Sequence, residues 1–340
     1  MKATLAIVFF GKVLGPDDLS DDSNKVSSLK FNQHSITFWN QGDAKPPTHV
    51  LFFDFLPKRD RETLKRFASS KKALARAEPR VVNPHQYATK VEKMFDLVFD
   101  SKVVVENGES KFGLWQVGYV PGNFKTQLQK TAQNTQDRAR RVGLINENKF
   151  SLVRGELYGL RAKVIMDSSF WEEPLQVAGK NWTRGLVWTL ARQLSALFDV
   201  LKAGSSPDVS RLRLPIGSSS AHFLGRVESE IDFLRSLEIA IVIENEATYV
   251  SEKLTNALIA GCRIVYVGPP IEHDHCCSAF IYASQPTSDA VGFAVHKILN
   301  DPKPSRDAFL EHLQTCKFLE SWLISERMAA LAGHVEKWVL

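Results

Sequence analysis

The side chains best suited to hold a phosphorylated ligand lie between residues 244 and 253. Glu244 and Asn245 follow a continuous apolar run, and a short loop then leads to Tyr-Val-Ser-Glu-Lys, in which Glu252 and Lys253 open a segment with an apolar stripe at helical spacing. The first turn of a helix offers free backbone N–H groups and the positive end of the helix dipole. Lys253 would add a full charge there, so this arrangement suits a diphosphate.

On spacing alone, a structural role is the favoured interpretation of the same residues. Glu252 would then stabilise the start of the helix, Lys253 would be solvated, and Tyr249 would act as an amphipathic cap. Against this, a lysine so early in a helix opposes the dipole, which is unusual for structure and useful for binding an anion. If the site binds a nucleotide sugar, Glu252 can accept hydrogen bonds from ribose or sugar hydroxyls.

The elements that must position these residues alternate along the chain. Strands are predicted at 4–10, 36–40, 49–55, 95–100, 238–245 and 263–268, where apolar runs are rich in β-branched and aromatic residues. Helices are predicted at 60–76, 123–141, 150–163, 186–201, 226–236 and 249–260, with two more after Pro304 that break near Gly333. Continuous apolar strands alternating with helices indicate an α/β protein with parallel sheets.

The clearest unit is the strand, helix and strand over 238–268, and ligands of such sheets gather at the carboxyl ends of the strands. No Gly-x-Gly-x-x-Gly fingerprint accompanies it, which argues against a dinucleotide-dependent dehydrogenase.

Length and composition limit the remaining classes of protein. The 340 residues suggest about two domains, and 44% hydrophobic with 24% charged residues is ordinary for a globular chain. The formal charge of +5 permits a polyanionic partner without requiring one. Four cysteines do not resemble a disulfide framework, and the short apolar run at 4–10 lacks a cleavage pattern. We therefore expect a cytoplasmic protein.

Two further clusters combine charged or metal-ligating residue types. The basic stretch 58–76 is typical of a solvated helix face, with contact to an anionic membrane surface or glycan as the alternative, and no nucleic acid is expected because aromatic residues are not interleaved. The run His273–Cys277 has the composition of a metal site, but its adjacent residues do not have zinc-ligand spacing, so a polar loop is expected.

The stretch EIAIVIENEATYVSEKLTNALIAGCRIVYVGPP at 238–270 resembles the donor-binding core of the α-1,3/4-fucosyltransferases. The resemblance implies a GT-B architecture, which is two Rossmann-like domains facing across a cleft. It also implies an inverting transfer of fucose from GDP-fucose to a glycan hydroxyl, with no cofactor and no obligatory metal. Carried over residue by residue, it makes Asn245, Tyr249, Glu252 and Lys253 donor-binding residues.

Two further segments carry the resemblance with fewer special positions. Residues 143–161 are similar to the segment in which an arginine opens a helix, which implies that Arg154 binds the donor phosphates. Residues 73–84 are similar to the acceptor-side segment in which a glutamate stands at a strand end, which implies that Glu78 is the general base. The chain departs from the pattern at Ile243, where a Phe is usual, and at Glu246, where a Ser is common.

These observations predict an acceptor-binding domain at 1–148, a donor-binding domain at 149–310, and helices at 311–340 that pack back on the first domain. The expected function is an inverting fucosyltransferase, with a nucleotide-sugar donor and a glycan acceptor as partners. Two alternatives stay open: a glycosyltransferase with another nucleotide-sugar donor, and a non-catalytic carbohydrate- or polyanion-binding protein. A peripheral position at the inner face of the membrane is the alternative location, through 58–76.

Overall fold

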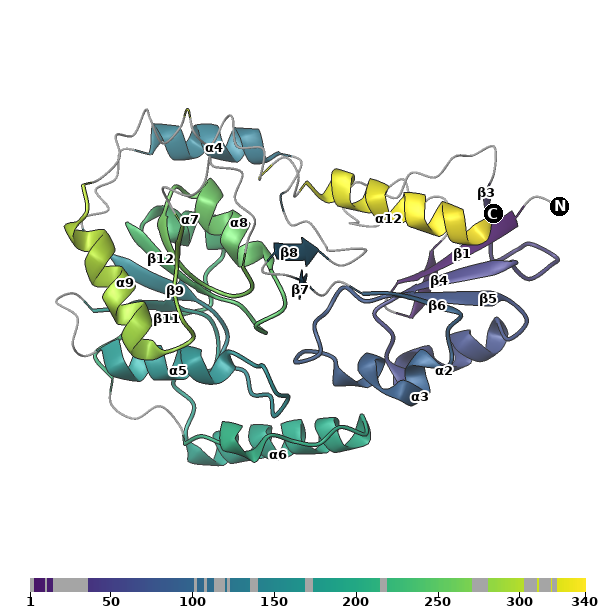
Figure 1. Ribbon diagram of the computed structural model, residues 1–340, viewed down its shortest axis with the longest axis horizontal. Helices are drawn as coiled ribbons and strands as arrows, with labels where there is room; N and C mark the ends of the chain where they lie inside the picture. The colour runs from purple at the N-terminus through teal and green to yellow at the C-terminus, as the bar shows by residue number, and fades with distance from the viewer. Residues whose placement is uncertain are drawn as a thin grey trace. The chain divides into compact units, whose positions relative to one another are not determined.

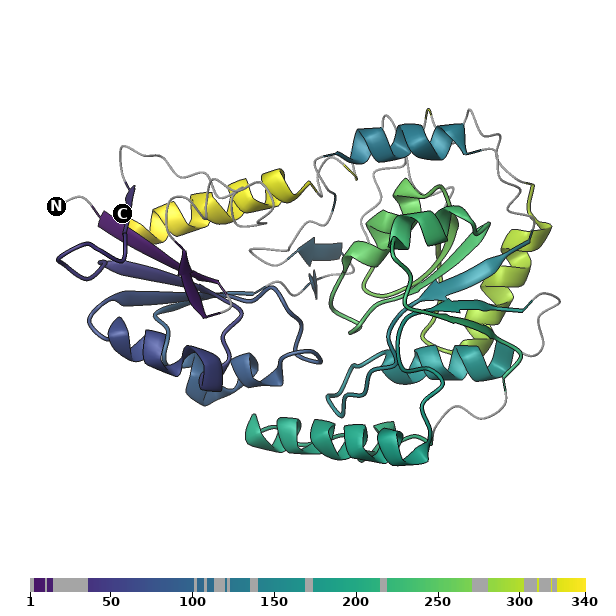
Figure 2. The same cartoon turned by 180° about the vertical axis from the view of Figure 1, so that it is seen from behind.

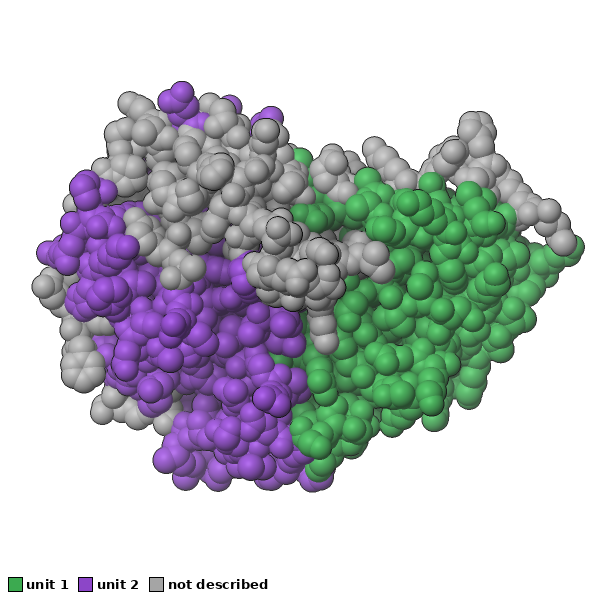
Figure 3. Space-filling model, viewed as in Figure 1, with its two compact units in different colours: residues 1–118, 199–206, 322–340 green, residues 119–198, 207–321 purple. Residues whose placement is uncertain are grey.

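The computed structural model describes residues 3–9, 11–14, 36–100, 103–106, 109–112, 120, 123–134, 140–168, 174–214, 219–270, 281–302, 311, 319 and 323–340. The chain divides into two compact units, coloured separately in Figure 3. Unit 1 holds residues 1–118, 199–206 and 322–340, and unit 2 holds 119–198 and 207–321. Unit 2 thus begins at Tyr119, and 322–340 belongs with the first unit.

Unit 1 is built on a six-stranded sheet. Its strands are β1 (Ala3–Phe9), β2 (Lys12–Leu14), β3 (Ile36–Phe38), β4 (His49–Phe53), β5 (Lys71–Ala75) and β6 (Leu97–Phe99). Their order is β2-β1-β4-β5-β6, with β3 also on β1, and every pair is parallel except β1 with β2. A separate antiparallel pair joins β7 (Val103–Glu106) to β8 (Glu109–Phe112).

Helices cover both faces of this sheet (Figures 1 and 2). On one face lie α2 (Pro57–Arg66), the short 3-10 helix η2 (Pro84–Tyr87) and α3 (Thr89–Glu92), over a core that includes Phe52 and Phe95. On the other face lies α12 (Ile324–Val339), and the centroid of its Trp338 ring lies 4.8 Å from that of the His49 ring. Both faces of the strands are therefore apolar, as the continuous runs predicted.

Two predicted helices in unit 1 were wrong. The helix expected at 60–76 ends at Arg66, and Lys71–Ala75 instead forms β5 between β4 and β6, because pairing with two strands outweighs the helix preference of Lys, Ala and Leu. The break expected near Gly333 does not occur: α12 runs through it, with Met328, Leu331 and Val335 buried along one side.

Unit 2 is built on a fully parallel sheet. Its strands are β9 (Val142–Ile145), β10 (Gln176–Ala178), β11 (His222–Gly225), β12 (Ile239–Ile243), β13 (Arg263–Val267) and β14 (Ile281–Ala283). The order is β11-β10-β9-β12-β13-β14. From β9 the chain builds outward to β11 and then returns to the other side of β9 at β12. The β9–β12 pair is therefore the topological switch point, where open α/β sheets bind their ligands.

Helices also line both faces of the second sheet. The helices α5 (Tyr158–Asp167) and α9 (Ser288–Asn300) share one core with Ile241 and Val265. On the other face, α8 (Glu252–Ile259) contacts β12 and β13, and α7 (Glu230–Arg235) contacts α8. The long helix α6 (Leu186–Lys202) lies beyond α5 in Figures 1 and 2, and a short 3-10 helix, η4 (Val209–Arg211), follows it.

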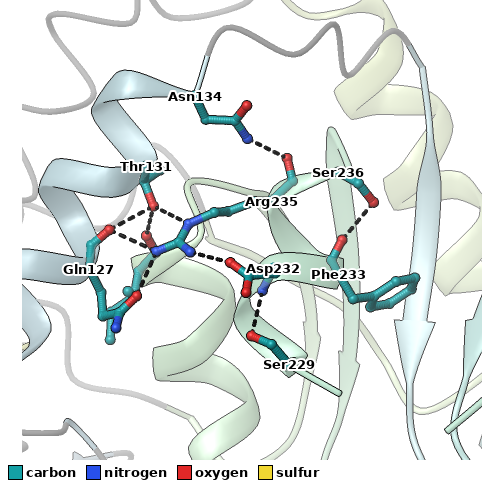
Figure 4. Close-up of polar contacts among 9 residues, drawn as sticks. Gln127, Thr131, Asn134, Ser229, Asp232, Phe233, Arg235 and Ser236 are labelled. Atoms are coloured by element: carbon teal, nitrogen blue, oxygen red, sulfur yellow. Dashed lines mark hydrogen bonds and ion pairs between the residues drawn. The ribbon is translucent and has the colours of Figure 1, made fainter. Parts of the chain in front are cut away.

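The buried Arg235 and the Thr131 hydroxyl help to attach the helix α4 (Phe124–Gln133) to the rest of unit 2 (Figure 4). Arg235 of α7 donates to the Thr131 hydroxyl at 3.0 Å and to two oxygens of Gln127 at 2.9 Å, and it pairs with Asp232 of its own helix. The Thr131 hydroxyl in turn donates to the Ile259 carbonyl at 2.8 Å. These contacts explain why unit 2 includes α4, which lies ahead of its first strand.

The clearest sequence patterns match the observed elements. The helix predicted at 186–201 is α6, and the unit over 238–268 is β12, α8 and β13, although α8 begins three residues later than expected. Over the described residues, no helix combines the length and apolar character that a membrane span requires. The predicted polar loop at His273–Cys277 lies outside the described residues.

Candidate functional site

The carboxyl ends of the unit 2 strands bring the predicted donor residues to one edge of the sheet. Residues 244–246 follow β12, and Asn146 follows β9 beside it, so both flank the switch point. The loop after β12 leads to α8, which begins at Glu252 with Ser251 at its N-cap. Sequence spacing predicted these residues at a strand end and a helix start, and the fold joins them at one edge.

A fully buried arginine fixes the position of Asn245. The Arg161 guanidinium, on α5, donates to the Ile243 carbonyl at 2.7 and 3.2 Å and to the Asn245 side-chain oxygen at 2.9 Å. Burial lowers the pKa of Arg161, while Tyr158 and Glu244 oppose this effect. Asn245 therefore cannot rotate without breaking a charge-assisted hydrogen bond in the interior. Sequence reasoning missed Arg161, because its partners lie 82 and 84 residues further along the chain.

Lys253 belongs to a buried polar chain rather than to a solvated face. Glu244 has no exposed surface and accepts a 2.5 Å hydrogen bond from the Ser251 hydroxyl, which in turn lies 3.2 Å from the Lys253 ammonium. Burial raises the pKa of Glu244, and the charge of Lys253 partly offsets this. The Lys253 side chain is only 14% exposed and lies 3.6 Å from Glu252. Its charge is thus held beside the first turn of α8.

The first turn of α8 keeps its backbone donors free of a side-chain cap. The hydroxyl at the N-cap, Ser251, is directed to Glu244, and no hydrogen bond from a side chain caps this helix. Glu252 is partly exposed at the same end, whereas Tyr249 is buried. This end of α8 therefore offers N–H groups, a nearby ammonium and one accessible carboxylate.

Arg154 lies on a turn rather than on the helix predicted at 150–163. The α5 helix begins only at Tyr158, and Gly155 has a φ of 92°, which ends any helical path through the segment. The turn is attached to the donor loop, because the Leu157 N–H donates to the Asn245 carbonyl and the Ala247 N–H to the Gly155 carbonyl. Arg154 is exposed on this turn, so the fold places it beside the loop that carries Asn245.

Further charged side chains support the same edge and were not predicted. Glu156 is buried and accepts from the Gly159 N–H at 3.0 Å, and burial raises its pKa. Arg213 donates to the Tyr158 carbonyl and to the Asn148 side chain, both at 2.9 Å, and burial lowers its pKa to about 10. Glu246, the acidic departure from the family pattern, is buried and accepts from Thr248.

In unit 1, Glu78 stands three residues after β5, at the carboxyl edge of its sheet. Asp54, which follows β4 with a φ of 51°, accepts from the Ala77 and Glu78 N–H groups at 2.9 Å and from Gln86 at 3.1 Å. Burial raises the pKa of Asp54, and these hydrogen bonds oppose the rise. Asp54 therefore fixes the backbone that carries Glu78. Sequence reasoning did not identify this role.

A cavity of about 390 Å³ opens at the same end of unit 1. It is bounded by residues that follow β4 and β5 and by the end of α6, with basic groups on Lys58, Arg59, His85 and Lys202 and a carboxylate on Asp199. Several cations of the 58–76 stretch are already used internally: Arg59 pairs with Asp60, and Arg76 is buried against Glu92. This stretch is therefore less free to meet an anionic surface than its composition suggested.

Metal-ligating side chains do not gather at either edge. Across the residues that the structure describes, no group of three or more His, Cys, Asp or Glu side chains is placed to hold a metal ion.

Comparison with known proteins supports the architecture. No family model and no curated protein matches the sequence. Among solved structures, a trehalose-phosphate synthase from Burkholderia xenovorans in complex with glucose-6-phosphate aligns with a TM-score of 0.50 at 10% identity, over 86% of this chain and 72% of that one. The chain has a GT-B fold. Each of its two α/β units, one with a mainly parallel and one with a fully parallel main sheet, matches the Rossmann-like domains expected of that fold.

Another GT-B structure is similar over its full length. Anabaena HepE, solved with UDP and glucose, aligns with a TM-score of 0.45 at 10% identity and covers 99% of both chains. A trehalose-6-phosphate synthase solved to understand glycosyl transfer with retention also aligns, with a TM-score of 0.46 at 9% identity over 86% of this chain and 74% of that one.

Proposed function

We propose that this GT-B protein is a glycosyltransferase that moves a sugar from a nucleoside-diphosphate sugar to a glycan hydroxyl. The observation that carries the proposal is the switch-point edge of unit 2, where the uncapped first turn of α8, the held ammonium of Lys253 and the exposed Arg154 turn come together. An edge that combines a helix N-terminus with cations suits the diphosphate of a donor. Asn245 and Glu252 would position the ribose and sugar, and Tyr249 would support this loop from within.

GDP-fucose is the donor that we propose, on the likeness of 238–270 to the fucosyltransferase donor core. The buried chain of hydrogen bonds supports that likeness, because it joins three residues of the shared motifs, Glu244, Ser251 and Lys253. Anabaena HepE was solved with UDP rather than GDP, so the nucleobase is the point to test first.

The proposed reaction is a single displacement. Glu78 would accept the proton of the acceptor hydroxyl as its oxygen attacks the anomeric carbon, and the bond from that carbon to the diphosphate oxygen would break. The charge that develops on the leaving diphosphate would be stabilised by Lys253, by Arg154 and by the α8 N–H groups. The resemblance to the fucosyltransferases implies that no metal ion is obligatory. This course inverts the anomeric centre, which distinguishes it from the retention described for trehalose-6-phosphate synthase.

Nucleotide binding tests the proposal directly. Thermal stabilisation of the full chain is measured with GDP, UDP and CMP, and nucleotide release is then measured with the corresponding sugar donors and a mixed glycan acceptor. We expect stabilisation and release with GDP-fucose. A preference for UDP would refute the fucose donor and keep the glycosyltransferase. Binding of no nucleotide would overturn the proposal in favour of a non-catalytic carbohydrate-binding protein.

Paired variants assign the residues. Arg154→Ala is expected to weaken GDP binding at least tenfold with an unchanged melting temperature, because Arg154 is exposed, whereas the exposed Arg192→Ala on α6 should change neither. Glu78→Gln should abolish turnover while GDP still binds. If Glu78→Gln keeps full activity, Glu78 is not the base. The anomeric configuration of the product, read by NMR, decides between inversion and retention.

A further inference from the structure

The exposed apolar residues of this protein are concentrated in one place. Fifteen large hydrophobic residues are exposed in the described part of the chain, and nine of them fall within 186–214. They are Leu186, Val187, Leu190, Leu194, Phe198, Leu201, Val209, Leu212 and Leu214, with exposed fractions from 49% to 82%. We call this set the α6 patch. Scattered single residues of this kind are normal at a protein surface, but a contiguous patch marks an interaction site.

The patch follows from the way α6 is packed. Its buried side carries Thr189, Gln193, Ala196 and Val200, which recur every three or four residues along one face. The exposed leucines recur with the same period about a third of a turn away. An ordinary amphipathic helix buries its apolar stripe, whereas the apolar stripe of α6 is exposed next to the face that packs on the protein.

A second segment widens the stripe. The Gln193 side chain donates to the Arg213 carbonyl at 2.7 Å and accepts from its N–H at 2.8 Å, which holds residues 212–214 alongside α6. The Arg213 side chain is directed inward to Tyr158 and Asn148. Leu212 and Leu214, its neighbours in an extended segment, are 54% and 76% exposed and add to the patch.

The spacing of the stripe is the same in both directions along the helix. Five of the six exposed apolar residues of α6, Val187, Leu190, Leu194, Phe198 and Leu201, are separated by three, four, four and three residues, a pattern symmetric about Leu194, and the sixth, Leu186, has Lys202 at its mirror position. We propose that the α6 patch is a homodimer interface in which two α6 helices pack antiparallel across a two-fold axis at Leu194. Val187 would then face Leu201 of the second copy, Leu190 would face Phe198, and Leu194 would face itself, as an isologous interface requires.

The size of the patch fits a stable dimer. Nine large apolar side chains, each about half exposed or more, make a patch that is large for a monomer surface, and a standard interface takes roughly 800 Å² from each partner. The charges on α6 favour a protein partner over a lipid surface. They are Arg192, Asp199 and Lys202, a net charge of +1, whereas helices that lie on anionic membranes are rich in lysine and arginine.

Sedimentation velocity of the full chain at micromolar concentration tests the dimer. The unmodified chain should sediment as a dimer and Leu194→Glu as a monomer, because the substitution places two carboxylates against each other at the axis. Phe293→Glu is the matched control, since Phe293 is 73% exposed on α9 and outside the patch, and it should stay dimeric. Melting temperatures of both variants within a few degrees of the unmodified chain would show that the fold is kept.

Oxidative cross-linking tests the geometry independently. Leu194→Cys should form a covalent dimer, and Ser195→Cys, one residue round the helix, should cross-link no more than the parent chain. A monomeric parent chain would overturn the proposal, as would a dimer that survives Leu194→Glu. Flotation of a monomeric parent chain with vesicles of anionic phospholipid, lost in Leu194→Glu, would assign the patch to a membrane instead and also overturn it. None of these outcomes depends on nucleotide binding.

Discussion

Replacing Arg161 tests whether the donor edge depends on one buried side chain. Arg161 is 1% exposed and satisfies the Ile243 carbonyl and the Asn245 side chain together, with its guanidinium 4.9 Å from the Tyr158 ring. In Arg161→Ala these acceptors lose their donor, and the buried Glu244 loses a nearby positive charge. We expect the variant to be strongly destabilised and to bind nucleotide poorly at temperatures where it remains folded.

The size of the effect follows from the contacts. A hydrogen bond to a charged group contributes about 1.5–3 kcal/mol, and removing one partner of a buried charged cluster costs about 3–5 kcal/mol. We therefore expect a loss of about 3–5 kcal/mol in the free energy of unfolding of unit 2. For a unit of about 200 residues, this corresponds to a melting temperature lower by roughly 6–20 °C. Arg161→Lys should recover little, because an ammonium cannot reproduce the forked geometry.

Calorimetric or circular-dichroism melting of the full chain measures this loss, with Lys163→Ala as the matched control. Lys163 is exposed two residues further along α5, and its removal should change stability by less than about 0.5 kcal/mol. The reasoning would be refuted if the free energy of unfolding of Arg161→Ala lay within about 1 kcal/mol of that of the unmodified chain. Normal nucleotide affinity in a folded Arg161→Ala would separately remove its role in orienting Asn245.

Two further substitutions test the same edge. Burial raises the folded-state pKa of Glu244 above its ordinary value of 4.5, so the folded state binds the carboxyl proton more tightly than the unfolded state does. The stability that the protonated Glu244 contributes is therefore fully present below pH 4.5 and is lost as the pH rises through the folded-state pKa. Urea unfolding between pH 4.5 and 7 should therefore show a shallower loss of stability in Glu244→Gln than in the unmodified chain; equal slopes would contradict the assignment. Gly179→Ala should lose about 3 kcal/mol or more, because Gly179 has a φ of 123° and its new Cβ would lie 1.9 Å from the Asn146 carbonyl oxygen. Gly185→Ala, which has open space around it, serves as the control and should melt normally.

The local sequence pattern predicted an element correctly where its own residue preferences and its packing in the fold favour the same secondary structure. The strand, helix and strand over 238–268 were predicted with ends that differ from the observed ones by up to three residues, because a buried parallel strand and an amphipathic helix carry different apolar patterns. The segment Lys71–Ala75 could not be predicted in this way: Lys, Ala and Leu favour a helix, and only the flanking strands β4 and β6 make it extended. The neighbours that decide its state lie in separate segments of the chain on either side.

In the candidate site, too, local spacing predicted some features, and contacts distant in sequence determine the others. Sequence spacing predicted that Lys253 lies at a helix start. It did not predict that Lys253 is linked through Ser251 to a buried Glu244. Arg161 and Asp54 were not predicted, because a single Arg or Asp in a local pattern is typical of a surface. Their roles arise from hydrogen bonds to residues 84 and 24 positions distant, which only the folded chain brings within reach.

The three-segment composition of unit 1 has a consequence for synthesis of the protein. The strands of this unit are complete before residue 118, but the face that carries His49 is covered by α12, which is translated only after all of unit 2. At about 5–20 residues per second, the roughly 200 intervening residues take about 10–40 s. During that interval the apolar sheet face lacks its covering helix, so unit 1 cannot complete its core until unit 2 has been synthesised.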